Sequence, residues 1–143
     1  MRHLTQDDKI IMTGPPKSIV DTVLTVDAYI DTAGFDRATI LILAGAGTTD
    51  KLVDAYVNEG ATTSPATKVT GSDITQLVAA SSNIGKIVSI ELDLKKRLRY
   101  IKPIITVSGG SATVLLACVV ILQGSQRKPR SLTESALAER VVV

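Results

Sequence analysis

The stretch KIVSIELDLKKRLRYIKPIITVSGGSATVLLACVVIL, residues 86–122, decides the fold class. Residues 86–94 alternate between apolar and polar side chains, and the apolar ones are Val88, Ile90, Leu92 and Leu94. Alternation with a period of two is the pattern of a strand that buries one face. Residues 97–107 form a second strand-like segment, and residues 112–122 form a third that is apolar on both faces. The stretch therefore predicts three consecutive strands, with a hairpin at Gly109 and Gly110 between the last two.

Further strands are predicted upstream by the same pattern. Residues 18–30 alternate, residues 38–44 are apolar on both faces as in a central strand, and residues 51–57 alternate again. A turn is expected around Gly34 and a short strand near Lys68. Pro103 constrains how the segment 97–107 pairs. Because proline has no amide hydrogen, it should occupy an edge, a bulge or an unpaired position.

Residues 72–81, SDITQLVAAS, admit two interpretations. Asp73, with Gln76 three residues later, matches a capping box and favours a short helix. The alternative is a loop that lays Ile74 and Leu77 over the core.

Seven or eight short strands without repeated helical crossovers predict an all-β chain, folded as a single antiparallel β-sandwich or jelly roll. We place this domain at residues 18–124. Residues 1–17 contain Pro15 and Pro16, which disfavour regular structure, and are expected to form an extended N-terminal arm. Residues 125–143 are expected to form a C-terminal arm.

Composition excludes several classes of function. The chain has 143 residues, is 45% hydrophobic and only 3% aromatic, and carries a net charge of +2. The core must therefore be aliphatic, and the charge is too balanced to indicate a nucleic-acid-binding protein. The apolar run 112–122 is shorter than the roughly 20 residues of a membrane-spanning helix, and it is expected to form a fully buried strand. The N-terminus turns acidic before any apolar stretch, so no signal peptide is expected.

Few residues could carry catalysis or hold a metal. The only histidine, His3, lies near the chain end, and the only cysteine, Cys118, lies in the most apolar run. Neither a disulfide nor a Cys/His zinc site can form within one chain. Glu91 and Asp93 share one face of a strand, which is also what an ordinary solvated surface looks like. We expect no catalytic site, cofactor or metal.

A basic cluster follows these carboxylates and comprises Lys95, Lys96, Arg97, Arg99 and Lys102. The favoured interpretation is a hairpin with a charged outer face, across which Glu91 and Asp93 pair with the cluster. Alternation places Arg97, Arg99 and Ile101 on one face, opposite Leu98, Tyr100 and Lys102. A charged protein–protein contact and a nucleic-acid site are the alternatives, although Tyr100 is the only nearby aromatic for base stacking.

Two segments resemble a group of small structural proteins of tailed bacteriophages. The first is VDAYIDTAGFDRATILILAGAG, and the second is KIVSIELDLKKRLRYIKPIITVSGGSATVLLACVVILQGSQRKP. The shared motifs are the turn Asp31–Asp36, the basic–Arg–Tyr strand Arg97–Lys102, the following glycine turn and the basic–Pro end of Gln123–Pro129. Residues 26–130 are covered. The polar insert lacks an aromatic residue, and the C-terminal extension is longer than is usual in the group.

The resemblance implies a virion protein of the capsid decoration or cement type, made in the host cytoplasm and bound to the capsid surface. Its partner would be the major capsid protein, whose shell it stabilises, and it would be a homo-oligomer, with a trimer favoured. Neither a membrane nor nucleic acid is expected as a partner. The alternatives are a tail or head–tail connector component, and a β-sandwich module that binds nucleic acid or carbohydrate.

The contact residues follow from this expectation. Arg97, Arg99 and Lys102 are expected to make charged contacts. The C-terminal Val141, Val142 and Val143 are expected to dock on an apolar surface, of this domain or of a neighbour.

Overall fold

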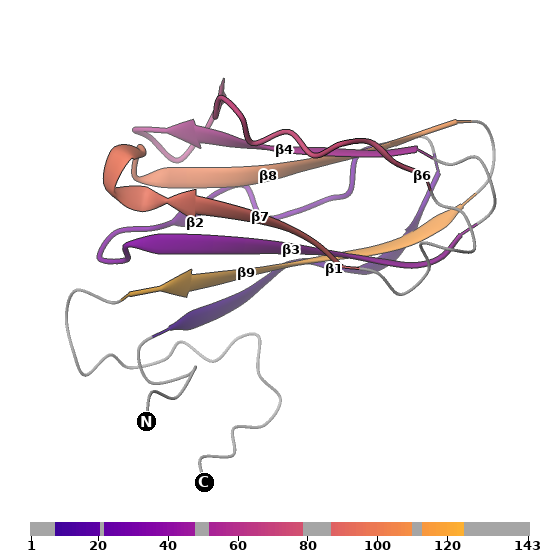
Figure 1. Ribbon diagram of the computed structural model, residues 1–143, viewed down its shortest axis with the longest axis horizontal. Helices are drawn as coiled ribbons and strands as arrows, with labels where there is room; N and C mark the ends of the chain where they lie inside the picture. The colour runs from indigo at the N-terminus through magenta and orange to yellow at the C-terminus, as the bar shows by residue number, and fades with distance from the viewer. Residues whose placement is uncertain (1–7, 21, 48–51, 79–86, 110–112, 125–143) are drawn as a thin grey trace, which may run out of the picture.

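The computed structural model describes residues 8–20, 22–47, 52–78, 87–109 and 113–124. In these residues the chain forms two antiparallel sheets that pack face to face (Figure 1). The four-stranded sheet has the order β1-β9-β3-β7, with β1 Lys9–Ile19, β9 Val114–Gln123, β3 Arg37–Gly47 and β7 Ile87–Asp93. The five-stranded sheet has the order β2-β8-β4-β5, and β6 also pairs with β4; the bounds are β2 Ile30–Asp31, β8 Tyr100–Ser108, β4 Leu52–Gly60, β5 Thr67–Lys68 and β6 Leu77–Val78.

The strand order is that of a jelly roll. The short strands β5 and β6 both pair with β4, one near each of its ends, and together they fill one strand position. With that position counted once, the first, eighth, third and sixth strands form one sheet, and the second, seventh, fourth and fifth form the other. This is the double Greek-key arrangement of jelly rolls. The predicted all-β sandwich is therefore confirmed.

The space between the sheets is filled by aliphatic side chains. Alternate residues of the long strands point inward, and their burial follows the period of two. Phe35 is the one aromatic residue among the buried side chains of the described part. The largest fully buried side chains are Ile19, Leu24, Ile40, Ile42, Ile101, Ile105, Leu116, Leu122, Val53, Val57 and Val69. An aliphatic core was predicted, and it is present.

Several predicted strands are confirmed. β3, β4, β7 and β9 match the four segments predicted by alternation or apolar runs, and β5 lies at Lys68. The turn at Gly34 has the left-handed φ of +82° that favours glycine. In β7, Ile90 and Leu92 face the core and Glu91 faces outward, as the alternation predicts.

Pro103 lies in β8 with its nitrogen facing away from β4. The neighbouring odd-numbered residues bond to the segment before β2: Leu24 N donates to Ile105 O (2.9 Å), and Val107 N donates to Thr22 O (2.9 Å). Because backbone groups alternate sides along a strand, the nitrogen of Pro103 faces the same way as the amide of Val107. The ladder with β4 loses no hydrogen bond, so the predicted unpaired position is confirmed.

The predicted N-terminal arm needs a correction. Residues 9–17 are part of β1, which pairs with β9 from Lys9↔Leu122 to Ile19↔Val114. The register shifts between Met12 and Gly14 and again between Gly14 and Lys17, so the two prolines fall in an irregular part of an edge strand. Prolines are tolerated at bulges and edges because no ladder amide is needed there. Residues 1–7 lie outside the described residues.

The hairpin predicted at Gly109 and Gly110 is wrong. β8 lies in the five-stranded sheet and β9 in the four-stranded sheet, so their connection passes from one layer to the other. Gly109 has a φ of +105°, as a sharp turn requires, while residues 110–112 lie outside the described residues. Turn residues predict that the chain reverses, but they do not specify which sheet receives the next strand.

The connection from β7 to β8 also crosses between the sheets. It runs through a short 3-10 helix, η2 Leu94–Lys96, which Asp93 caps by accepting a hydrogen bond from Lys95 N (3.1 Å). Glu91 and Asp93 therefore do not face the basic cluster across a hairpin, contrary to the prediction.

Residues 18–30 do not form the predicted strand. β1 ends at Ile19, and the described residues 22–29 form only an isolated bridge, Val23↔Thr106, before β2 begins. This segment carries the chain from one sheet to the other. The alternation arises because individual apolar side chains of this segment are buried in the core. Leu24 is 1% exposed, whereas its neighbour Val23 is 47% exposed.

The predicted helix is also wrong over residues 72–78, and residues 79–81 lie outside the described part. The chain instead lies along β4: Ile74 N donates to Ala55 O (3.0 Å), and β6 follows. Ile74 and Leu77 pack against the core, as the alternative interpretation predicts.

Candidate functional site

The outer face of the five-stranded sheet carries Arg99 and Lys102, two of the three residues predicted to make charged contacts. Along β8, Tyr100, Lys102 and Ile104 point outward because the residues between them face the core. Lys102 is half-buried and lies opposite Asn58 of β4. This face is therefore built by the two longest strands of the sheet.

Arg99 is held in place just before β8. Its Nε donates to Asp31 Oδ1 (2.9 Å) and its Nη2 donates to Asp31 Oδ2 (2.7 Å), which is the two-pronged geometry of strong arginine–carboxylate pairs. The hydrogen bond from Arg99 lowers the pKa of Asp31, partial burial opposes this, and the amide of Ala33 lowers it further. The same pair raises the pKa of Arg99. Both side chains thus stay charged and fixed.

Arg99 does not share a face with the buried Ile101, contrary to the prediction. It precedes the first residue of β8, so the alternation of the strand does not govern it. The ion pair with Asp31 and the ring of Tyr100, whose centroid lies 5.1 Å from Arg99 Cζ, position it at the surface instead.

Two tyrosines meet beside this arginine. The rings of Tyr29 and Tyr100 are 5.4 Å apart and perpendicular, the edge-to-face arrangement that aromatic pairs favour. Tyr29 is 42% exposed. The pair forms a rigid aromatic surface next to the guanidinium group.

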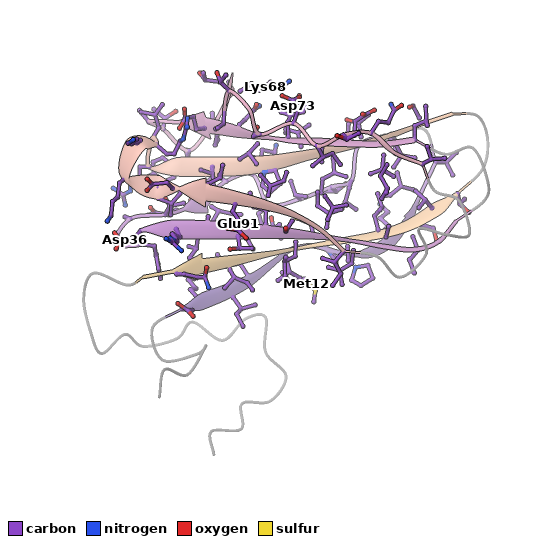
Figure 2. All side chains as sticks on the ribbon, in the orientation of Figure 1. Met12, Asp36, Lys68, Asp73 and Glu91 are labelled. Atoms are coloured by element: carbon purple, nitrogen blue, oxygen red, sulfur yellow. The ribbon has the colours of Figure 1, made fainter. Side chains whose placement is uncertain are left out.

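The third tyrosine lies further along the same face. Tyr56 of β4 is opposite Ile104 of β8, and Lys68 Nζ sits 4.7 Å from the centre of its ring. Lys68 also forms an ion pair with Asp73, and both lie at the outer edge of the sheet (Figure 2). We call the surface formed by Tyr29, Tyr56, Tyr100, Arg99 and Lys102 the tyrosine–arginine face.

Arg97 is placed apart from this face and acts on the local structure. Its amide donates to Leu94 O (3.2 Å) at the end of η2, and its Nη1 lies 3.6 Å from Glu59 Oε1. Glu59 Oε2 also accepts a hydrogen bond from Leu98 N (3.0 Å). The carboxylate therefore fastens the entry of β8 to the end of β4.

The carboxylates considered for catalysis lie on the other sheet. Glu91 and Asp93 are exposed on the outer face of β7, opposite Thr39 and Arg37 of β3. A hollow of about 450 Å³ adjoins Asp93 but not Glu91, and it is lined by Asp36, Arg37, Asp93, Lys95, Gln123 and Gly124. Within the described residues the carboxylate of Asp93 caps η2 by accepting the hydrogen bond from Lys95 N.

Cys118 lies in the core of β9 and is 0% exposed. Burial raises the pKa of its thiol to about 12, so the thiolate needed for nucleophilic chemistry is disfavoured. In the part of the chain with described coordinates, no three His, Cys, Asp or Glu side chains gather as a metal site would require. His3 and Val141–Val143 lie outside that part.

The apolar run at 112–122 forms the strand β9 as predicted, but within the described residues only its inner face is buried, so the predicted full burial is not observed. Among the described residues, no helix has the length and apolar character needed to cross a membrane. Comparison with models of known protein families and with curated protein sequences gives no match.

Sequence reasoning missed how the tyrosines gather. Alternation could place Tyr56 and Tyr100 outward, because the residues on either side of each follow the inward pattern. It could not place Tyr29 beside Tyr100, since this contact depends on β2 pairing with β8 across 70 intervening positions of chain, from Ile30 to Ile101. Only the order of strands in the sheet brings the three rings to one face.

Proposed function

We propose that this chain is a structural protein of a tailed-bacteriophage particle, of the capsid decoration or cement type. It would bind the major capsid protein and stabilise the shell. The resemblance over residues 26–130 supports this function, and jelly rolls are common in capsid proteins, although lectins and cupins share the fold. The fold is compatible with several functions, so the proposal depends on the surface.

The observation that carries the proposal is the tyrosine–arginine face. Tyrosine and arginine are enriched at the centres of protein–protein interfaces, where they supply a large part of the binding energy. Arg99 is already held by Asp31 and Tyr100, so binding would cost little side-chain entropy. All of the chain's 3 tyrosines lie on this face, whereas its one phenylalanine is buried.

Binding to particles that lack this protein tests the proposal. Purified wild-type protein and two double variants, Tyr29→Ala/Tyr100→Ala and Arg99→Ala/Lys102→Ala, would be sedimented with such particles over a range of concentrations. We expect the wild type to saturate the shell and each double variant to bind at least about 30-fold more weakly, as loss of a hot spot of about 2 kcal/mol implies.

The matched control is Glu91→Gln, which removes a charge from the opposite sheet and should bind like the wild type. Failure of the wild type to bind would overturn the assignment to the shell. Equal binding by all variants would overturn the role of the tyrosine–arginine face.

The mass of the oligomer in solution distinguishes a capsid decoration protein from the alternative, a tail or head–tail connector component. A homotrimer fits a decoration protein, because shell proteins commonly sit on threefold axes. A ring of higher order would instead favour the connector.

A binding module for carbohydrate or nucleic acid is the second candidate, and the exposed Tyr29–Tyr100 pair favours it. Stacking on sugars or bases would quench tyrosine fluorescence when oligosaccharides or single-stranded DNA are added. For DNA, the affinity would also fall steeply with salt.

A further inference from the structure

The outer face of the four-stranded sheet is apolar over most of its length. Register places Met12, Val119 and Leu41 in one row across three strands, and Ala117, Leu43 and Ile87 in another. We call this surface the apolar outer face; its members are Ile10, Met12, Leu41, Leu43, Ile87, Leu115, Ala117, Val119 and Ile121.

This face differs from an ordinary strand surface in water. Strands that are apolar on both sides are typical of sheets covered on both faces, and residues 38–44 and 112–122 show that pattern. Yet in the described part of the chain only the inner side is buried, while Ile87 is 59% exposed, Leu115 40% and Leu43 37%. A contiguous exposed patch of this kind marks an interaction surface.

The apolar outer face contains a hollow at the end far from Gln123. Its volume is about 330 Å³, near the lower end of the roughly 300–1,000 Å³ typical of small-ligand pockets. The outward-facing members of its lining are Pro16, Leu43, Gly45, Ile87, Leu115 and Ala117. Gly45 contributes to the hollow because a Cβ there would lie 3.0 Å from Leu115 Cδ2.

The opposite end of the sheet's outer surface is charged. Glu91 lies beyond the apolar members of β7 (Figure 2), and Asp93 follows it, opposite Arg37 of β3. β9 ends in the same row, and Gly124 follows with a left-handed φ of +72°. A Cβ at Gly124 would lie 3.1 Å from Asp36 Cβ, so the chain leaves the sheet at this charged end.

The C-terminal segment has the complementary order of side chains. Arg127, Lys128 and Arg130 come first, and the apolar residues follow, ending with Val141–Val143. The sheet surface runs from charged, with the carboxylates of Glu91 and Asp93, to apolar with distance from Gly124, and the segment runs from basic to apolar with distance from the same residue.

We propose that residues 125–143 fold back over the apolar outer face of their own chain. Arg127, Lys128 and Arg130 would pair with Glu91 and Asp93, and Val141–Val143 would enter the hollow beside Gly45.

The segment is long enough for this path. From Gln123 to the level of Leu116 the sheet extends about 23 Å, at about 3.3 Å per residue. The 17 residues from Gly124 to Val141 can span about 56 Å when extended, at about 3.3 Å per residue. Because the segment is tethered, its local concentration at the face is in the millimolar range.

A second copy of the domain fits this surface less well. Its own charged end carries Glu91 and Asp93 together with Arg37, whereas residues 125–130 carry three basic residues and no acidic one. The C-terminal segment supplies the opposite charge at the correct end and apolar side chains at the other.

Disulfide trapping in the full-length chain tests the proposal. Val142→Cys would be combined with Ile87→Cys on the apolar outer face, or with Val23→Cys as a matched control. Val23 is also an exposed aliphatic residue, 47% exposed, but it lies against the other sheet. Cys118 is 0% exposed and stays out of the reaction.

We expect an intramolecular disulfide to form several-fold faster with Ile87→Cys than with Val23→Cys. Changing Arg127, Lys128 and Arg130 to Glu should remove most of that advantage. If Ile87→Cys harms folding, Leu115→Cys provides a second position on the same face.

Equal rates for the two pairs would overturn the proposal, because a free segment would reach both. Predominant disulfide-linked dimers would also overturn it, since the occupant would then be a second copy. The outcome is independent of shell binding, which is measured with variants of the other sheet.

Discussion

Arg99 and Asp31, 68 positions apart in the chain, form a two-pronged ion pair that joins the start of β8 to the end of β2. The pair is reinforced by backbone: Thr32 N donates to Arg99 O (3.0 Å), and Thr32 Oγ1 donates to the same oxygen (2.6 Å). It therefore closes one edge of the five-stranded sheet and, at the same time, fixes the guanidinium group on the tyrosine–arginine face.

Asp31→Asn should lower stability at neutral pH but not in acid. Arg99 holds the pKa of Asp31 below its ordinary value of 3.8. A carboxylate with a lowered pKa contributes stability above its unfolded pKa, and this contribution is lost as pH falls through the folded value. Urea midpoints at pH 7 should therefore differ between wild type and variant, and the difference should shrink as the pH falls through the lowered pKa of Asp31. Asp27→Asn, a charge change away from Arg99, is the control for loss of a carboxylate elsewhere; a wild-type advantage over Asp31→Asn that stays the same in acid would contradict this account of the pair.

Cys118 should be inert in the folded protein. Burial raises its pKa from 9.0 to about 12, so at pH 8 a thiol reagent should modify it only after unfolding. The raised pKa of Cys118 also makes the free energy of unfolding depend on pH. The stabilisation from the protonated thiol is complete below pH 9 and is lost as the pH rises toward 12, because the unfolded chain releases the thiol proton first. Labelling followed by mass spectrometry, with and without urea, checks the reactivity. Rapid labelling of the native protein would contradict the burial of this thiol.

Ile105→Ala and Ile104→Ala should differ strongly although the residues are adjacent in β8. Ile105 is 0% exposed in the core, so its truncation should cost about 2–5 kcal/mol of unfolding free energy. Ile104 points outward and is only half-buried, so the same change should cost clearly less. Urea denaturation of both variants gives the comparison, and equal costs would show that the inward and outward faces of β8 are assigned incorrectly.

Gly60→Ala should destabilise the end of β4. A Cβ at this position would lie 2.8 Å from Pro65 Cα, which is backbone and cannot move aside cheaply. We expect a cost of about 1–3 kcal/mol, as for other overpacked sites. Gly45→Ala is the control, because there the contact is the end of the flexible Leu115 side chain. Thermal unfolding should place Gly60→Ala well below Gly45→Ala, and the reverse order would contradict the packing of Pro65 on β4.

The positions of the strands could be predicted from the sequence better than the pairing of each strand with its neighbours in the sheet. β3, β4, β7 and β9 follow from alternation or apolar runs because the side-chain period is a local property. The pairing of β1 with β9 was not predictable, since Pro15 and Pro16 disfavour a strand locally and are tolerated only at an irregular sheet edge. Turn residues such as Gly109 predicted reversals but not the crossings between layers that make the jelly roll.

The candidate site was predictable only in part. The basic residues of the 95–102 segment were evident, but Asp31 as the partner of Arg99 and Tyr29 as the neighbour of Tyr100 both depend on the β2–β8 pairing. The apolar character of residues 38–44 and 112–122 was also evident and was interpreted as burial on both sides. In the described residues one of those sides is open, and that difference led to the proposed role of the C-terminal segment.

Electron cryo-microscopy of particles assembled from the encoding genome tests the central proposal most directly. We predict jelly-roll density on the outer surface of the shell, with the tyrosine–arginine face against the major capsid protein and Arg99 within contact distance of it. Particles whose shell lacks this density, or density that contacts the shell only through the four-stranded sheet, would contradict the account.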